Sequence, residues 1–159
     1  MRRAFLLAGG AALLAGCGFQ LRKPPEFAFR TIAVPGTSGV ATQLRRQLSA
    51  TPNAEVLPDA ARADVVLDIL SEQQEKVVVG LNASGQVREF QLRHRVLFRL
   101  RTPQGRELIP ATELQQQRDV SFNESAVLAK EAEEGLLYRE MQADLVQQLM
   151  RRLAAVRTI

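Results

Sequence analysis

The chain has 159 residues, of which 46% are hydrophobic and 24% charged, a balance typical of one globular domain. Its net charge of +4 falls to +2 if a leader carrying Arg2 and Arg3 is removed, which is too small to argue for a nucleic-acid partner. The single cysteine, Cys17, excludes an internal disulfide.

The first sixteen residues predict a secretory signal peptide. Arg2 and Arg3 form a positive start, and residues 4–15 form an uncharged apolar run. This run is too short to span a bilayer, because a spanning helix needs about twenty apolar residues. It ends in Leu14-Ala15-Gly16-Cys17, which resembles the lipobox at which bacterial lipoproteins are acylated and cleaved. The alternative is an ordinary signal peptide that happens to end at a cysteine.

Acylation of Cys17 would divide the chain into a signal peptide (1–16), a lipidated tether (17–28) and a periplasmic α/β domain (29–159). Several acyl chains on one residue anchor a protein stably, whereas one chain does so only marginally. By resemblance to the bacterial sorting rule, Gly18 in place of aspartate favours export to the outer membrane. The sequence therefore predicts an outer-membrane lipoprotein whose domain faces the periplasm.

The domain begins with a strand and a short helix. Residues 29–34 predict the strand, which Pro35-Gly36 ends, and residues 40–49 predict an amphipathic helix that ends before Pro52-Asn53. Residues 63–74 predict a second strand, which residues 77–81 either continue or extend with a kink.

The clearest strand covers residues 87–101 and follows a predicted turn at residues 82–85. One of its faces is apolar and includes the only histidine: Phe90, Leu92, His94, Val96, Phe98 and Leu100. The other face is mainly polar and basic: Glu89, Gln91, Arg93, Arg95, Leu97, Arg99 and Arg101. This alternation predicts a half-buried antiparallel strand, with residues 107–122 returning as its partner.

A long C-terminal helix follows, capped either by Asn123 or by a capping box of Ser121 and Glu124. Its apolar residues recur every four positions at Leu137, Met141, Leu145, Leu149 and Leu153. The elements together predict an α+β fold, a two-layer sandwich with two helices packed on one face of a four-stranded mixed sheet.

The residues favour a protein that is not an enzyme and that holds no cofactor or metal. Cys17 is consumed by lipidation, and His94 lies on the apolar face of its strand, which favours a buried core imidazole over a catalytic one. Three glutamates gather early in the last helix, where a solvated face is the more common arrangement: Glu131, Glu133 and Glu134.

From Cys17 onward the chain resembles the LptE family of LPS-assembly lipoproteins. The resemblance rests on the start Cys17-Gly18-Phe19-Gln20-Leu21-Arg22 and on the turn and strand of residues 85–92. It continues through residues 118–123, the Leu-Ala-Lys motif that ends at Lys130, and residues 147–153. Order and spacing agree over nearly the whole mature chain.

The resemblance implies a plug for a large outer-membrane β-barrel, LptD, in a one-to-one complex that inserts lipopolysaccharide into the outer leaflet. It also implies that the protein assists barrel assembly and binds lipopolysaccharide directly. The phosphates of lipid A suit lysine and arginine, so the expected lipopolysaccharide-binding residues are Lys130, Arg88, Arg93 and Arg118. Some family members carry arginine in the turn where this chain has Ala83, and Arg88 is the expected substitute.

Other interpretations stay open at this stage. Lys130 and the three arginines can equally be solubilising surface charges. An auxiliary lipoprotein of a phospholipid-transport system would also be a small anchored α/β domain, and a lipoprotein hydrolase would need a constellation that the chain lacks. We further expect Arg93, Arg95, Arg99 and Arg101 to contact the barrel, because adjacent like charges without acidic neighbours are costly.

Overall fold

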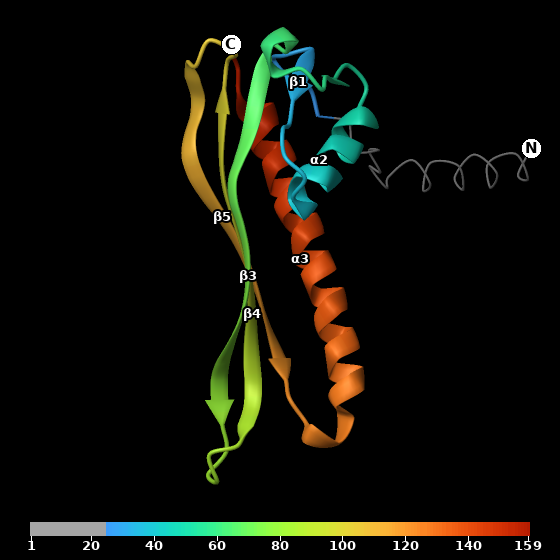
Figure 1. Cartoon of the computed structure of the whole chain (residues 1–159), viewed down its shortest axis with the longest axis vertical. Helices are drawn as coiled ribbons and strands as arrows, with labels where there is room; N and C mark the ends of the chain where they lie inside the picture. Colours follow the sequence, from blue (N-terminus) through green and yellow to red (C-terminus); the bar gives the residue numbers. More distant parts are fainter. Residues whose placement is uncertain (1–24) are drawn as a thin grey trace, which may run out of the picture.

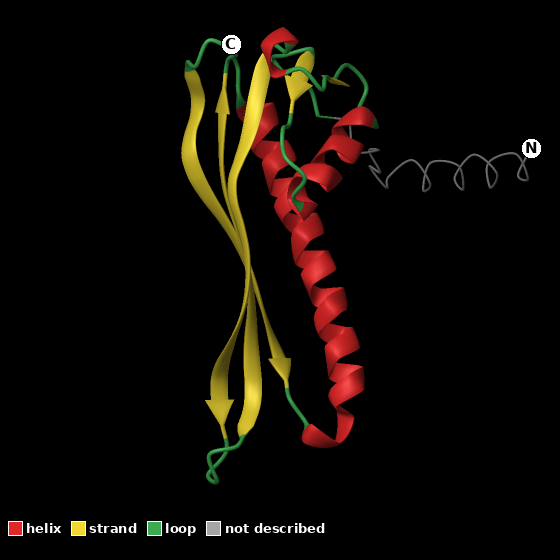
Figure 2. Cartoon of the chain, viewed as in Figure 1, coloured by secondary structure: helices red, strands yellow, loops and turns green. Residues whose placement is uncertain are grey.

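Two helices cover one face of a five-stranded mixed sheet in the computed structural model, which describes residues 25–159 (Figure 2). The strands lie in the order β2-β1-β3-β4-β5. In chain order the elements are β1 (Thr31–Ala33), α2 (Gly39–Ser49), β2 (Glu55–Val56), β3 (Val65–Leu81), β4 (Val87–Arg101), β5 (Glu107–Ser121) and α3 (Val127–Ala155). The predicted α+β sandwich is confirmed, with five strands instead of four.

The additional strand is β2, which is only two residues long. It follows Asn53, a residue with positive φ (67°), and it pairs in parallel with β1. β1 also pairs in parallel with β3, so α2 is the crossover that returns the chain to the same edge of the sheet. A two-residue strand carries no readable alternation, and for this reason the sequence predicted four strands.

β3, β4 and β5 form a long antiparallel meander. β4 occupies the predicted residues 87–101, and β3 continues through residue 81 as one strand. A β-bulge between Ile69 and Ser71 changes which side chains of β3 face the helices. Leu67 and Ile69 pack into the core before the bulge, whereas Glu72 contacts the buried His94 after it. The bulge therefore moves the helix-facing positions of β3 from odd to even numbers.

The last helix, α3, has 29 residues and is about 44 Å long at 1.5 Å per residue. Asn123, the first of the two predicted caps, accepts a hydrogen bond from the Ser125 backbone N–H and opens a short 3₁₀ turn before α3. Figure 1 shows α3 running along the meander, with its start at the end of the molecule that also holds the β3–β4 turn. The C-terminus and α2 lie toward the other end.

The main core lies where α2, α3 and the sheet meet, and its fully buried side chains include Leu44, Leu67, Phe98, Leu145 and Leu149. A smaller cluster of Leu92, Val120 and Met141 lies farther along the meander, packed against Phe90, Leu137 and Tyr138. In this part of the molecule α3 alone covers the sheet, so the helical layer is narrower than at the main core. Side chains at the edges of the second cluster therefore stay accessible to solvent.

Candidate functional site

A small cleft lies between the first turns of α3 and the adjoining ends of β3, β4 and β5. It combines aromatic, aliphatic, lysine and glutamate side chains: Lys76, Phe90, Val120, Ser121, Phe122, Val127, Lys130, Glu131 and Glu134. We call this set the α3 cleft. It contains Lys130, the residue on which the expected binding site depends most.

The apolar wall of the α3 cleft is built on an aromatic pair. Phe90 and Phe122 meet edge to face with their ring centroids 5.3 Å apart. The backbone N–H of Phe122 donates to the carbonyl oxygen of Arg88 at 2.8 Å, which ties the chain after β5 to the start of β4. Leu92 and Val120 are buried beside this pair. The wall is therefore held by packing and by backbone pairing.

Each lysine of the cleft is paired with a carboxylate. Lys130 Nζ donates to Ser121 Oγ at 3.1 Å and to Glu133 Oε2 at 2.8 Å, and its side chain is 24% exposed. Lys76 Nζ lies 2.6 Å from Glu134 Oε2 and 4.4 Å from the centroid of the Phe90 ring. The cleft thus presents two ammonium groups next to apolar surface, with their charge balanced by the protein itself.

The structure groups only some of the predicted site residues. Arg88 is exposed at the same end as Lys130, and its backbone bonds to Phe122 of the cleft wall. Arg93 lies between the buried Leu92 and His94 and therefore points from the opposite face of the sheet, where its Nε donates to Gln91. Of the expected binding residues Arg88 and Arg93, the structure therefore brings Arg88 to the end of the domain that holds Lys130, and it places Arg93 on the other face of the sheet.

Arg118 is also remote from the α3 cleft. It faces α3 and donates to Asp144 Oδ2 at 2.8 Å. Asp144 is 14 residues beyond Lys130, a separation of about 21 Å along the helix. Sequence reasoning missed Lys76 in turn, because the bulge of β3 decides whether that residue faces α3 or the opposite side.

Three of the four arginines on the outer face of β4 pair with carboxylates of its neighbour β3. Arg99 Nε and Arg101 Nε donate to Asp68 Oδ2 at 2.9 and 2.8 Å, and Arg95 pairs with Glu75. Burial alone would raise the pKa of Asp68, but hydrogen bonds from Arg101 and Arg99 outweigh it and lower that pKa below its ordinary value. The expectation of arginines without acidic neighbours is therefore wrong.

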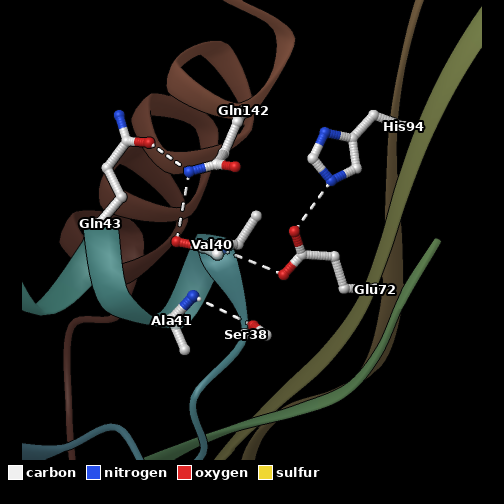
Figure 3. A network of polar contacts seen from close by, with 8 residues as sticks. Ser38, Val40, Ala41, Gln43, Glu72, His94 and Gln142 are labelled. Carbon is white, nitrogen blue, oxygen red and sulfur yellow. Dashed lines mark hydrogen bonds and ion pairs between the residues drawn. The ribbon is translucent and has the colours of Figure 1, made fainter. Parts of the chain in front are cut away.

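The only histidine is part of a polar network between the sheet and α2 (Figure 3). His94 is completely buried, and its Nε2 lies 3.0 Å from Glu72 Oε1. The other carboxylate oxygen of Glu72 accepts the Val40 backbone N–H at 3.0 Å, at the start of α2. His94 is thus a core imidazole that contacts one carboxylate, as its position on the apolar face of its strand predicted.

Further contacts join this network to the helices. Ser38 caps α2 by accepting from the Ala41 N–H at 3.2 Å, and Gln142 of α3 donates to Gln43 of α2 at 2.7 Å. Burial would raise the pKa of Glu72, but hydrogen bonds, that of His94 first, lower it instead. The carboxylate therefore stays ionised and positions α2, which is a structural role.

Cys17, the predicted lipidation site, lies outside the described residues. Among residues 25–159 no three His, Cys, Asp or Glu side chains are grouped closely enough to hold a metal ion. None of the helices in this range is long and apolar enough to cross a membrane.

The fold and the α3 cleft place the chain in a class of small two-layer α+β domains, here with an amphiphilic cleft at the start of the long helix. The family model described as "LptE: Lipopolysaccharide-assembly" matches residues 29–153, and the chain therefore belongs to the LptE family. This result confirms the resemblance that was inferred from the sequence motifs.

Curated relatives agree with the family match. The LPS-assembly lipoprotein LptE of Pectobacterium atrosepticum is 28% identical and aligns over 97% of this chain and 86% of its own length. The protein of the same name from Yersinia enterocolitica is 32% identical over 95% of this chain and 75% of its own length.

Solved structures share the fold. The solution structure of an uncharacterized lipoprotein B from Nitrosomonas europaea superposes with a TM-score of 0.76 at 35% identity, covering 87% of this chain and 91% of that chain. A rare lipoprotein B from Shewanella oneidensis gives a TM-score of 0.68 at 20% identity, covering 79% and 94%. The second likeness shows the fold alone.

Proposed function

We propose that this chain is an outer-membrane lipoprotein of lipopolysaccharide assembly. It is anchored by acyl chains on Cys17, its domain faces the periplasm, and it plugs an LptD-type barrel in a one-to-one complex. In this role it helps the barrel assemble, binds lipopolysaccharide and assists its insertion into the outer leaflet, without catalysis. The match of the LptE family to residues 29–153 is the observation that carries the proposal.

The anchor is supported by the alignment with the Pectobacterium protein, whose name includes the word lipoprotein. The alignment covers 97% of this chain, which leaves only a few residues unmatched, so it extends across Cys17. Gly18 follows the cysteine in place of the aspartate that retains lipoproteins in the inner membrane. Acylation at Cys17 would therefore tie the domain to the outer membrane through the short tether.

The barrel contact is supported by the outer face of the sheet. Arg93, Arg95, Arg99 and Arg101 alternate there with glutamine and acidic residues of β3 and β5, so this face offers many donors and acceptors and little net charge. The interior of a large membrane barrel is polar and suits such a surface. A plug also buries a large area, and interfaces above about 2,000 Å² are usually long-lived.

Lipopolysaccharide binding is assigned to the α3 cleft. Lys130 carries the only ammonium of the family's Leu-Ala-Lys motif, and it lies beside Phe90 and Phe122 at the cleft wall. A lipid A phosphate can bind the ammonium while an acyl chain covers the apolar wall. Arg88, whose backbone carbonyl accepts from Phe122 of the cleft wall, would join such a ligand at the same end, whereas Arg93 and Arg118 would act only on more distant parts of it.

Two experiments test the proposal. Tagged full-length chain, purified from its own membranes in mild detergent, should bring down a large barrel in equal amount. A partner from an inner-membrane or phospholipid-transport system would overturn the assembly role. Binding of lipopolysaccharide should fall about tenfold for Lys130→Asp and stay unchanged for Arg157→Asp near the C-terminus. Equal binding by both variants and the wild type would refute the assignment of Lys130.

A further inference from the structure

We propose that Lys76 is a second phosphate-binding lysine of the α3 cleft, and that Glu133 and Glu134 are exchangeable counter-ions which a phosphorylated amphiphile displaces from Lys130 and Lys76. This inference rests on the proposed function and adds to it a second binding residue, Lys76, and two carboxylates that compete with the ligand for the lysines.

The position of Lys76 follows from the register of β3. Lys76 pairs with Leu92 of β4, and Leu92 is completely buried under α3. Residues opposite one another share a face of the sheet, so Lys76 is directed toward α3 and the cleft. Its ammonium lies 4.4 Å from the centroid of the Phe90 ring, and its side chain remains 36% exposed. The lysine is therefore fixed on the cleft wall and still reachable by a ligand.

The carboxylates that hold the two lysines are themselves accessible. Glu134 has a side chain that is 23% exposed, and that of Glu133 is 47% exposed. Ion pairs at such positions are weak, because water screens the charges and both long side chains lose rotamer freedom. A phosphate offers more negative charge and more acceptor oxygens than one carboxylate, so it can replace Glu133 and Glu134 at modest cost.

The chemistry around the lysines selects the class of ligand. Phe90, Val120, Phe122 and Val127 form one side of the cleft, and Val127 remains 41% exposed. Leu128, the next residue, is 83% exposed beside it. Free phosphate would use only the ammonium groups, whereas a phosphate joined to an acyl chain would also cover this apolar surface. The cleft therefore fits a phosphorylated amphiphile better than a small anion.

The test uses the full-length lipoprotein purified in detergent. The probes are bisphosphorylated lipid A, the same lipid A without its phosphates, and inorganic phosphate. Lys76→Met keeps the apolar stem over Phe90 and removes the charge. Arg157→Met is the matched control, two residues before the C-terminus, which Figure 1 marks at the end of the molecule away from the start of α3. Glu134→Gln frees the ammonium of Lys76 without shortening the side chain.

For bisphosphorylated lipid A, Lys76→Met should weaken binding about fivefold to tenfold, and Glu134→Gln should strengthen it about threefold. Both effects should vanish with dephosphorylated lipid A, and inorganic phosphate should bind far more weakly. If Lys76→Met weakens both forms of lipid A equally, its role is packing and the inference fails. If Lys76→Met fails to fold, Glu134→Gln is the test: tighter binding of bisphosphorylated lipid A supports the inference, and unchanged binding overturns it.

Failure of the inference is distinguishable from failure of the proposed function. Wild-type affinity from both Lys76→Met and Glu134→Gln, together with weaker binding by Lys130→Met, would refute the inference and leave lipopolysaccharide binding intact. No binding of lipid A by the wild-type protein would overturn the proposed lipopolysaccharide binding itself, and the inference with it.

Discussion

Replacing Glu72 with leucine tests whether the network of Figure 3 holds α2 against the sheet. An ionised carboxylate only accepts hydrogen bonds, so His94 donates to it through Nε2, and Val40 donates its backbone N–H. A buried donor left without an acceptor costs about 1–3 kcal/mol, or about 2–6 kcal/mol for the two. The apolar leucine offsets part of this cost, and we expect unfolding to become easier by about 2–4 kcal/mol.

The loss should appear in thermal and urea unfolding followed by circular dichroism. A change of 1 kcal/mol shifts Tm by about 3 °C in a domain of this size, so Tm should fall by about 6–12 °C. Glu113→Leu, at an exposed acid on β5, is the matched control and should leave Tm nearly unchanged. A Glu72→Leu variant whose stability stays within about 0.5 kcal/mol of wild type would refute the reasoning.

A double variant, Glu72→Leu with His94→Leu, separates the loss of the hydrogen bond from the change in side-chain size. Adding His94→Leu removes the buried imidazole, so no ring nitrogen is left without an acceptor. Replacing both partners of a buried hydrogen bond is less costly than replacing one. The double variant should therefore be destabilised by at least about 1 kcal/mol less than the sum of the single variants. Strict additivity would show that His94 and Glu72 act independently.

Three further outcomes are expected. The pKa of Asp68 in the folded protein lies below its ordinary value of 3.8, so its carboxylate stabilises the fold above that pH and this stability is lost as the pH falls through the folded pKa. The difference in free energy of unfolding between wild type and Asp68→Asn, measured in urea, should therefore become smaller below pH 3.8. Gly85 has φ +78° with nothing within 4 Å of an added Cβ, so Gly85→Ala should cost about 1 kcal/mol through the backbone alone, measured by Tm. Intact-mass spectrometry should find acyl chains on Cys17 of the mature chain, and an unmodified mass would contradict the anchor.

The sequence by itself determined the elements that have a strong period. The alternation over residues 87–101 predicted β4 and its buried face, including His94, because a strand half covered by helices needs one apolar side. The repeat of apolar residues along the last helix likewise predicted the side of α3 that packs on the sheet. The same alternation already placed Arg93 on the face of β4 away from His94. The prediction that Arg93 binds the same ligand as Lys130 therefore conflicted with the pattern.

Only the tertiary structure decided how the elements meet. The bulge after Ile69 turns Lys76 toward α3, and a bulge follows from pairing between strands, which no local pattern reveals. The register of β3 against β4 likewise brings Asp68 to Arg99 and Arg101, across 31 and 33 residues of chain. Local periodicity determines which face of a strand is buried, but the position of one strand along its neighbour depends on bulges, turns and packing far away in the sequence. For this reason the carboxylate partners of the β4 arginines, and the second lysine of the α3 cleft, could be found only in the folded molecule.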